Sequence, residues 1–172
     1  MIDKQEWAER QWNLFRQMNQ ELKLTMELVP KRLRYLSMSY LMEPEEYREL
    51  REHVFRHYEH RCGICYSSGG TWFHETCEYN DENHICTLTG FIALCELCFG
   101  VKHFDVINQK ALDPKYDVLR FVQHFKEVNQ RSEDDFIAYK NSAFFVWNQR
   151  NKFNWTQDTS SYKYLVEKSE VR

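Results

Sequence analysis

The sequence predicts an α+β fold that is mostly helical, with a short pair of strands near the middle of the chain. Few residues interrupt helices, because the 172 residues include only 5 Gly and 3 Pro. Hydrophobic residues make up 42% of the chain, which is enough to build a core. Two pairs of cysteines flank the strand-like stretch. These observations together indicate helices arranged around a short pair of strands that two cysteine pairs flank.

The N-terminal third is predicted to contain two helices. Apolar side chains recur near helical spacing in residues 3–28, which indicates an amphipathic helix. Its apolar stripe either packs on the main domain or docks on a partner, including a second copy of the chain. Residues 31–42 are expected to form an irregular connector. A second helix is predicted over residues 44–60, since Pro44 and the two acids behind it suit a helix N-terminus.

The remaining elements follow from local patterns. Short strands are predicted around Thr71–His74 and Cys86–Leu88. Helices are predicted near residues 96–104, 114–129 and 132–150. The last of these helices begins with a serine followed by three acids, which is typical of an N-cap. A polar tail with one aromatic anchor, Trp155, is expected to follow.

Four cysteines form two Cys-x-x-Cys pairs, Cys62 with Cys65 and Cys95 with Cys98. Zinc takes four ligands at tetrahedral corners, and two such turns supply two corners each. The sequence therefore predicts one structural Zn²⁺ on these four residues. One alternative treats the four cysteines as small core residues. Another treats one pair as a redox centre, but this would leave the second pair without a role.

Composition narrows the classes of partner and the expected compartment. A formal net charge of −3 restricts any nucleic-acid contact to a local basic patch. No apolar run reaches the roughly 18–20 residues that span a bilayer, so no membrane partner is expected. The polar, acidic N-terminus is unlike a signal peptide, and a cytoplasmic location is predicted. In a reducing cytoplasm, paired cysteines favour metal binding over disulfides, and Cys77 and Cys86 are expected to be free thiols or extra ligands.

Several further motifs follow one another between Arg48 and His103. They are the stretch from Arg51 to Cys65, His74-Glu75, Glu78–Asp81, Leu88–Cys95, the second cysteine pair and Val101–His103. Together they resemble the HNH endonuclease family, and most closely an uncharacterised HNH-like subgroup. Flanking segments also resemble that subgroup, namely Leu28-Val29-Pro30, Trp147, Arg150 and Trp155-Thr156. The resemblance covers about residues 28–160.

The resemblance implies a ββα-metal core, in which a hairpin and a helix surround a catalytic ion and the four cysteines form a separate scaffold. In an active member, a histidine activates water and one Mg²⁺ or Mn²⁺ stabilises the scissile phosphate of DNA. By this resemblance His74 or Glu75 provides the base and first metal ligand, with the two roles left open between them. His103 corresponds to a further histidine of the subgroup. The alternatives are a structural His74 and a solvated Glu75.

The sequence departs from the family pattern at its reactive positions. The residue directly after Cys98 is usually histidine and is Phe99 here. Gly90 stands where the wider family often has asparagine. Losing even a group that supports a metal ligand reduces affinity or activity about 10–100-fold, so losing a ligand should reduce it more. The resemblance therefore implies a retained fold with a catalytic site that has degenerated at Phe99.

The same motifs divide the chain into three expected segments. Residues 1–28 are an N-terminal helical extension. Residues 29–150 are an HNH-like zinc domain with helices at its C-terminal end. Residues 151–172 are a C-terminal tail.

Three functions follow from these expectations. The first is a zinc-stabilised, HNH-like protein that binds a protein or nucleic-acid partner, for example as a phage- or plasmid-type regulator or inhibitor. The alternative is an active metal-dependent endonuclease that cleaves DNA with His74, Glu75, Asp81 and His103. The second alternative is a structural protein that forms homo-oligomers through its N-terminal helix.

Overall fold

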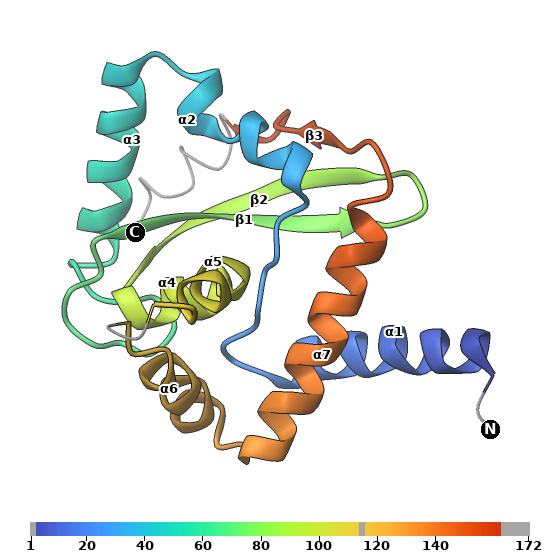
Figure 1. The fold of residues 1–172 in the computed structure, drawn as a ribbon. Coiled ribbons are helices and arrows are strands. Elements are labelled where there is room, and N and C mark those ends of the chain that lie inside the picture. The colour runs from blue at the N-terminus through green and yellow to red at the C-terminus, as the bar shows by residue number, and fades with distance from the viewer. Residues whose placement is uncertain (1–2, 114–115, 163–172) are drawn as a thin grey trace. The chain divides into compact units, whose positions relative to one another are not determined.

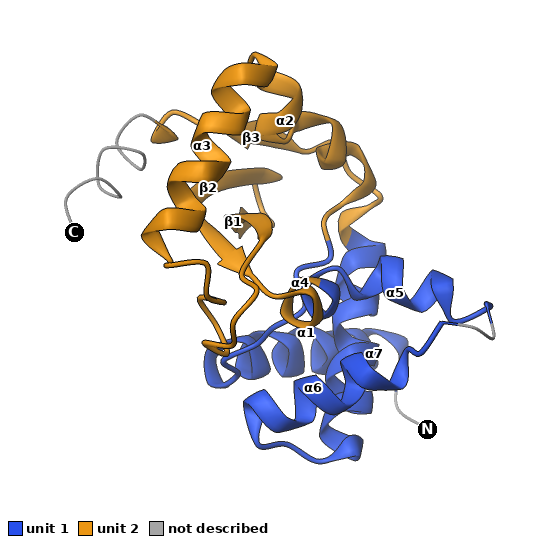
Figure 2. Ribbon diagram, turned by 90° about the vertical axis from the view of Figure 1, so that its left-hand side faces the viewer, with its two compact units in different colours: residues 1–28, 100–149 blue, residues 29–99, 150–172 orange. Residues whose placement is uncertain are grey.

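The computed structural model describes residues 3–113 and 116–162. Helices make up about 54% of these residues and a sheet of three strands accompanies them, which confirms the mostly helical α+β class. None of the described helices is both long and apolar enough to cross a membrane. The chain divides into two compact units (Figure 2). Unit 1 comprises Met1–Leu28 and Gly100–Gln149, and unit 2 comprises Val29–Phe99 and Arg150–Arg172.

This division differs from the three expected segments, because residues 1–28 group with 100–149. Whether those segments are folding domains stays a prediction. The chain passes from unit 2 to unit 1 within α4 (Glu96–Lys102), between Phe99 and Gly100.

Unit 1 is built mainly of helices (Figure 1). They are α1 (Lys4–Glu21), α5 (Phe104–Lys110), α6 (Leu119–Asn129) and α7 (Glu133–Arg150). The start of α7 agrees with the prediction. The Ser132 hydroxyl accepts the Asp135 N–H at 3.1 Å, and the Asp135 carboxylate accepts the Ser132 N–H at 3.0 Å. The expected start of the preceding helix at residue 114 lies outside the described residues, and α6 begins at Leu119.

A cluster of aromatic rings lies in the interior of unit 1, among aliphatic side chains. The Phe125 ring lies 5.2 Å from that of Phe136 and 5.7 Å from that of Tyr139, measured between centroids. The buried Tyr139 hydroxyl donates to Oδ1 of Asn19 at 2.7 Å and accepts the Met26 N–H at 3.0 Å. Burying a tyrosine ring is favourable when its hydroxyl keeps such partners. Helix α1 therefore packs within unit 1 through residues that contact α7.

Helix α1 ends at Glu21 instead of residue 28. The next residues are extended, and the apolar side chains of residues 22, 24, 26 and 28 are buried in alternation with more exposed neighbours. The Asn129 side chain accepts the Leu24 N–H at 2.8 Å and donates to the Leu24 carbonyl at 2.9 Å. These bonds satisfy backbone groups that a helix would have paired internally, so the extended segment is stable here.

Unit 2 surrounds a small sheet with short helices (Figure 1). Its helices are the 3₁₀ helix η1 (Lys31–Leu36), α2 (Met38–Leu41), α3 (Pro44–His57) and the start of α4. Its strands are β1 (Trp72–Asn80), β2 (Ile85–Leu94) and β3 (Thr156–Asp158). The expected irregular connector over residues 31–42 is therefore mostly helical.

The sheet is larger than the sequence suggested. β1 and β2 form an antiparallel hairpin that extends well beyond the two predicted short strands, with a bulge between Thr76 and Cys77. β3 adds in parallel to the start of β2, where Ile85 pairs with Thr156. Trp155 anchors this addition as predicted, since its ring is buried and its indole N–H donates to the Arg150 carbonyl at 2.8 Å.

Candidate metal centre

The four cysteines of the two Cys-x-x-Cys pairs converge in unit 2. Their Sγ atoms all lie within 4.8 Å of one another. The Sγ atoms of Cys65 and Cys95 are 3.7 Å apart. Four metal–sulfur bonds of about 2.3 Å in tetrahedral geometry place any two sulfurs about 3.8 Å apart, whereas a disulfide needs about 2.05 Å. The cluster is therefore close enough to hold a metal ion and too open at this pair for a disulfide.

The first cysteine pair lies in a tight turn after α3. The Tyr66 N–H donates to the Cys62 carbonyl at 2.9 Å, and the Cys62 N–H donates to the Ser67 carbonyl at 2.9 Å. The Gly63 N–H donates to the Ala93 carbonyl at 2.8 Å, which ties the turn to β2. These backbone bonds fix the shape of the turn that carries the two sulfurs.

Two glycines allow this turn to pack closely. A Cβ on Gly63 would lie 2.7 Å from side-chain atoms of both Ile92 and Tyr58. A Cβ on Gly70 would lie 2.2 Å from the Arg61 carbonyl oxygen. Both distances are far below van der Waals contact, so any larger residue would displace the turn.

The second cysteine pair lies where β2 passes into α4. Cys95 directly precedes the helix, and its carbonyl accepts the Phe99 N–H at 2.9 Å. Its Sγ accepts the Cys98 N–H at 3.4 Å, so Cys95 acts as the N-cap of α4. Backbone N–H groups at the start of a helix favour the thiolate form of a capping cysteine. The bond from the Cys98 N–H also holds the Cys95 sulfur at the start of α4.

Burial makes the cluster unfavourable for bare negative charge. Cys62 and Cys98 are fully buried, whereas Cys65 is partly exposed and lies 3.1 Å from Oγ of Ser67. Hydrogen bonding to the Cys95 thiol raises the pKa of Cys62. Hydrogen bonding to the Cys62 thiol, then to Cys95, and burial raise the pKa of Cys98 strongly. Four neighbouring thiolates need a cation to offset their repulsion, and a divalent metal ion fits this donor set.

His74 and Glu75 are adjacent on β1 and point to opposite faces of the sheet. The His74 side chain is 4% exposed, and its ring meets the ring of Phe99 edge-on at 6.2 Å. The Glu75 carboxylate accepts the N–H of Met38 at 2.9 Å, in the first turn of α2. The structure therefore does not bring these two predicted site residues together.

The remaining predicted site residues belong to other elements of the chain. His103 belongs to unit 1, directly before α5, whereas His74 belongs to unit 2. Asp81 accepts two hydrogen bonds from the Arg150 guanidinium, at 2.7 and 2.9 Å. This fork-like pair lies beside the Tyr79 ring, which the guanidinium covers at 4.2 Å from the centroid. Catalytic roles for His74, Glu75 and His103 stay predictions.

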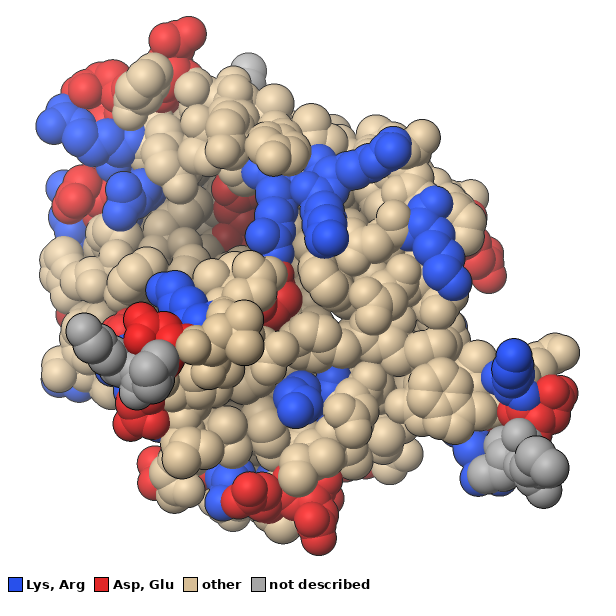
Figure 3. Space-filling view, in the orientation of Figure 1, with Lys and Arg blue, Asp and Glu red and all other residues tan. Residues whose placement is uncertain are grey.

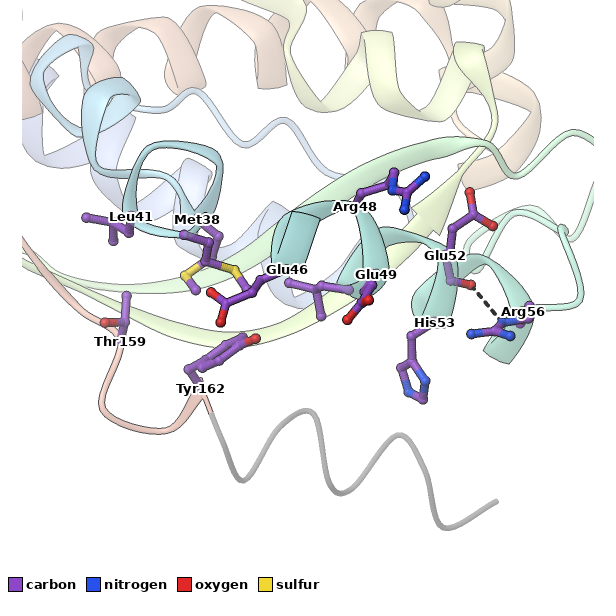
Figure 4. A pocket seen from close by; sticks show the side chains of 12 residues that line it. Met38, Leu41, Glu46, Arg48, Glu49, Glu52, His53, Arg56, Thr159 and Tyr162 are labelled. Carbon is purple, nitrogen blue, oxygen red and sulfur yellow. Dashed lines mark hydrogen bonds between the residues drawn. The ribbon is translucent and has the colours of Figure 1, made fainter. Parts of the chain in front are cut away.

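A groove of about 1030 Å³ along α3 was not foreseen from the sequence. Figure 4 shows it between α2, α3 and the turn that carries Thr159 and Tyr162. Apolar residues of α2 meet a mixture of acidic and basic residues of α3 there. Burial, and then the nearby Glu46 carboxylate, raise the pKa of Tyr162. The groove depends on the pairing of distant segments, so no local motif could have indicated it.

No family model, curated protein or solved structure matches this chain. The resemblance to the HNH family therefore depends on the sequence motifs alone. The support for the candidate metal centre is different, since it comes from the positions of four sulfur atoms in the structure.

Proposed function

We propose that the four cysteines hold one structural zinc ion, and that unit 2 is an HNH-like module that binds a partner without cleaving DNA. Zinc is favoured because all four donors are sulfur and the 3.7 Å between the sulfurs of Cys65 and Cys95 matches a tetrahedral site. The order of β1, β2 and α4 supports the HNH-like part of the proposal, since a hairpin followed by a helix is the arrangement that the resemblance implies.

The contact between Phe99 and His74 is the observation that carries the proposal of a non-catalytic module. A general base must reach the proton that it abstracts, directly or through one water molecule. Here a buried histidine packs against an apolar ring, at the position where the family has a second histidine. The Trp72 ring lies 4.8 Å from the same phenylalanine and adds to this aromatic packing.

Two other groups that a nuclease would need already have structural partners. The Glu75 carboxylate binds a backbone N–H of α2, and the Asp81 carboxylate binds both arms of the Arg150 guanidinium. A carboxylate that satisfies a helix N-terminus or a partly buried arginine is poorly placed to bind a catalytic ion as well. These contacts support a role in which the scaffold is retained for binding.

Metal content and DNA cleavage should be measured on one preparation of the full chain. We expect about one zinc per chain by elemental analysis, and no nicking of supercoiled plasmid with Mg²⁺ or Mn²⁺. Cys95→Ser should lose the zinc, and Cys77→Ser, which alters a cysteine outside the cluster, should keep it. Metal-dependent nicking that disappears in His74→Ala would overturn the non-catalytic module. Absence of zinc from folded protein would overturn the structural ion.

A further inference from the structure

The 3₁₀ helix η1 directs basic and aromatic side chains outward. Residues three apart are eclipsed in a 3₁₀ helix, so the six residues form three rows. The rows are Leu33 with Leu36, Lys31 with Arg34, and Arg32 with Tyr35. The leucine row faces inward, where buried Leu33 packs with Cys86 and Trp155. All four residues of the other two rows are exposed.

Two tyrosines stand out on this surface because they are open to solvent. Tyr35 is 71% exposed and Tyr40 of α2 is 66% exposed. Their ring centroids are 6.1 Å apart and their planes are tilted by 59°, so the two rings form an angled platform on which each ring offers its own face. The Lys31 N–H donates to Oδ1 of Asn151 at 2.8 Å, and this bond fixes the start of η1 on unit 2. The platform therefore lies on an anchored element, although the fold buries little of the rings.

The same surface is basic in a chain that is acidic as a whole. Residues 28–42 contain two arginines and one lysine and no aspartate or glutamate, whereas the chain has a net charge of −3. Figure 3 shows Lys and Arg side chains gathered over η1. Such a local concentration of positive charge is complementary to a polyanion.

We propose that η1 and α2 form a binding surface for single-stranded nucleic acid. Tyr35 and Tyr40 stack on unpaired bases, and the three cations of η1 contact the phosphates on either side. Stacking on exposed rings needs bases that are not paired within a duplex, which favours a single strand. A membrane surface is disfavoured because α2 has only 4 residues, too few for an interfacial amphipathic helix. This inference depends on the proposed binding function and names its partner.

Fluorescence anisotropy with the full chain tests the class of ligand. The probes are a labelled 12-nucleotide DNA strand, the matching RNA strand, the 12-base-pair duplex and phosphatidylserine vesicles. We expect binding to one or both single strands, weaker binding to the duplex and none to vesicles. Affinity should fall about 20-fold between 50 and 200 mM salt, because three phosphate contacts on a single strand give a logarithmic slope of about −2. Preference for the duplex or for vesicles would overturn the proposal.

Variants test the two kinds of contact separately. Tyr35→Ala and Tyr40→Ala should each weaken binding about 5- to 150-fold, and Tyr35→Phe should keep it, since stacking needs the ring alone. Arg32→Ala should reduce the salt slope by about 0.7. Arg48→Ala changes an exposed residue elsewhere in unit 2 and should leave binding unchanged.

Zinc content of each variant shows whether unit 2 is still folded, so a structural loss is separated from a lost contact. Unchanged affinity in the zinc-loaded tyrosine variants would overturn this inference and leave the proposed function standing. Metal-dependent nicking by the native protein would overturn the non-catalytic module and leave the single-strand surface standing.

Discussion

The two compact units stabilise themselves in different ways. Unit 1 has a cluster of packed aromatic rings in its interior. Hydrogen bonds of the buried Tyr139 and the half-buried Asn129 join α7 to α1, and α6 to the segment that follows α1. Unit 2 has a small sheet whose turns converge on four sulfur atoms. Apolar packing thus orders unit 1, whereas unit 2 combines apolar clusters with a four-cysteine site that is close enough to hold a metal ion.

Removal of the proposed zinc should have the largest effect, and this effect should be confined to unit 2. Binding of structural zinc is worth on the order of 10 kcal/mol, so a strong chelator should unfold the region around the cysteines. In hydrogen exchange followed by mass spectrometry, we expect residues 58–99 to lose protection while α6 and α7 keep theirs. Cys98→Ser should reproduce this pattern and Cys77→Ser should not. Equal loss of protection in both units would contradict the comparison.

Truncation of an aromatic ring should instead weaken unit 1. The ring of Phe125 is fully buried, and Phe125→Ala should reduce the free energy of unfolding by about 3–5 kcal/mol. Leu119→Ala, on the same helix but 74% exposed, should change it by less than about 0.5 kcal/mol. Urea denaturation measures both values, and zinc content should be unchanged in each. Loss of zinc from Phe125→Ala would show that the units are not separable in this way.

The hydrogen bonds to the extended segment after α1 provide a smaller test. Asn129→Ala removes two partners of the Leu24 backbone and should reduce the stability of unit 1 by about 1–3 kcal/mol. Asn129→Asp keeps an acceptor for the Leu24 N–H but loses the donor to its carbonyl, so its effect should lie between native and alanine. Gln123→Ala, which removes a hydrogen bond to Glu127 on the exposed face of α6, is the control in the same denaturation series.

The smallest expected effect concerns the start of α7. Ser132→Ala removes the capping hydroxyl and should reduce stability by about 1 kcal/mol. Hydrogen bonds from the Ser132 hydroxyl and then from its backbone N–H lower the pKa of Asp135. A lowered pKa stabilises the fold above the unfolded-state pKa, and this contribution disappears as the pH falls through the folded-state pKa.

Denaturation at neutral and strongly acidic pH should therefore show a smaller effect of Ser132→Ala in acid, where the carboxylate no longer accepts these bonds. An equal effect at both pH values would indicate that the carboxylate adds nothing to the cap.

Local patterns predicted the parts of the fold that depend on short stretches of sequence. The cysteine cluster was predictable because each Cys-x-x-Cys turn presents two ligands within four residues. The start of α7 was predictable because a serine and an acid three residues later satisfy the same backbone groups. Proline and two acids similarly marked the start of α3.

Features that depend on distant pairing were not predictable in this way. β3 has 3 residues and exists because it pairs with β2, far earlier in the chain. The segment after α1 is extended because Asn129 reaches its backbone, although the preceding residues continue a helical pattern. His74 and Glu75 could not be assigned to faces until the register of the hairpin was known.

The two units are each made of two separate pieces of chain, and this has a consequence for synthesis on the ribosome. All four cysteines lie in the first piece of unit 2, which ends at Phe99. The metal centre can therefore form before residues 150–162, which supply β3, have been translated. The N-terminal piece of unit 1 must instead wait until residues 100–149 have emerged. If the proposed zinc binds, a nascent chain would thus bind it before the earliest helix is buried.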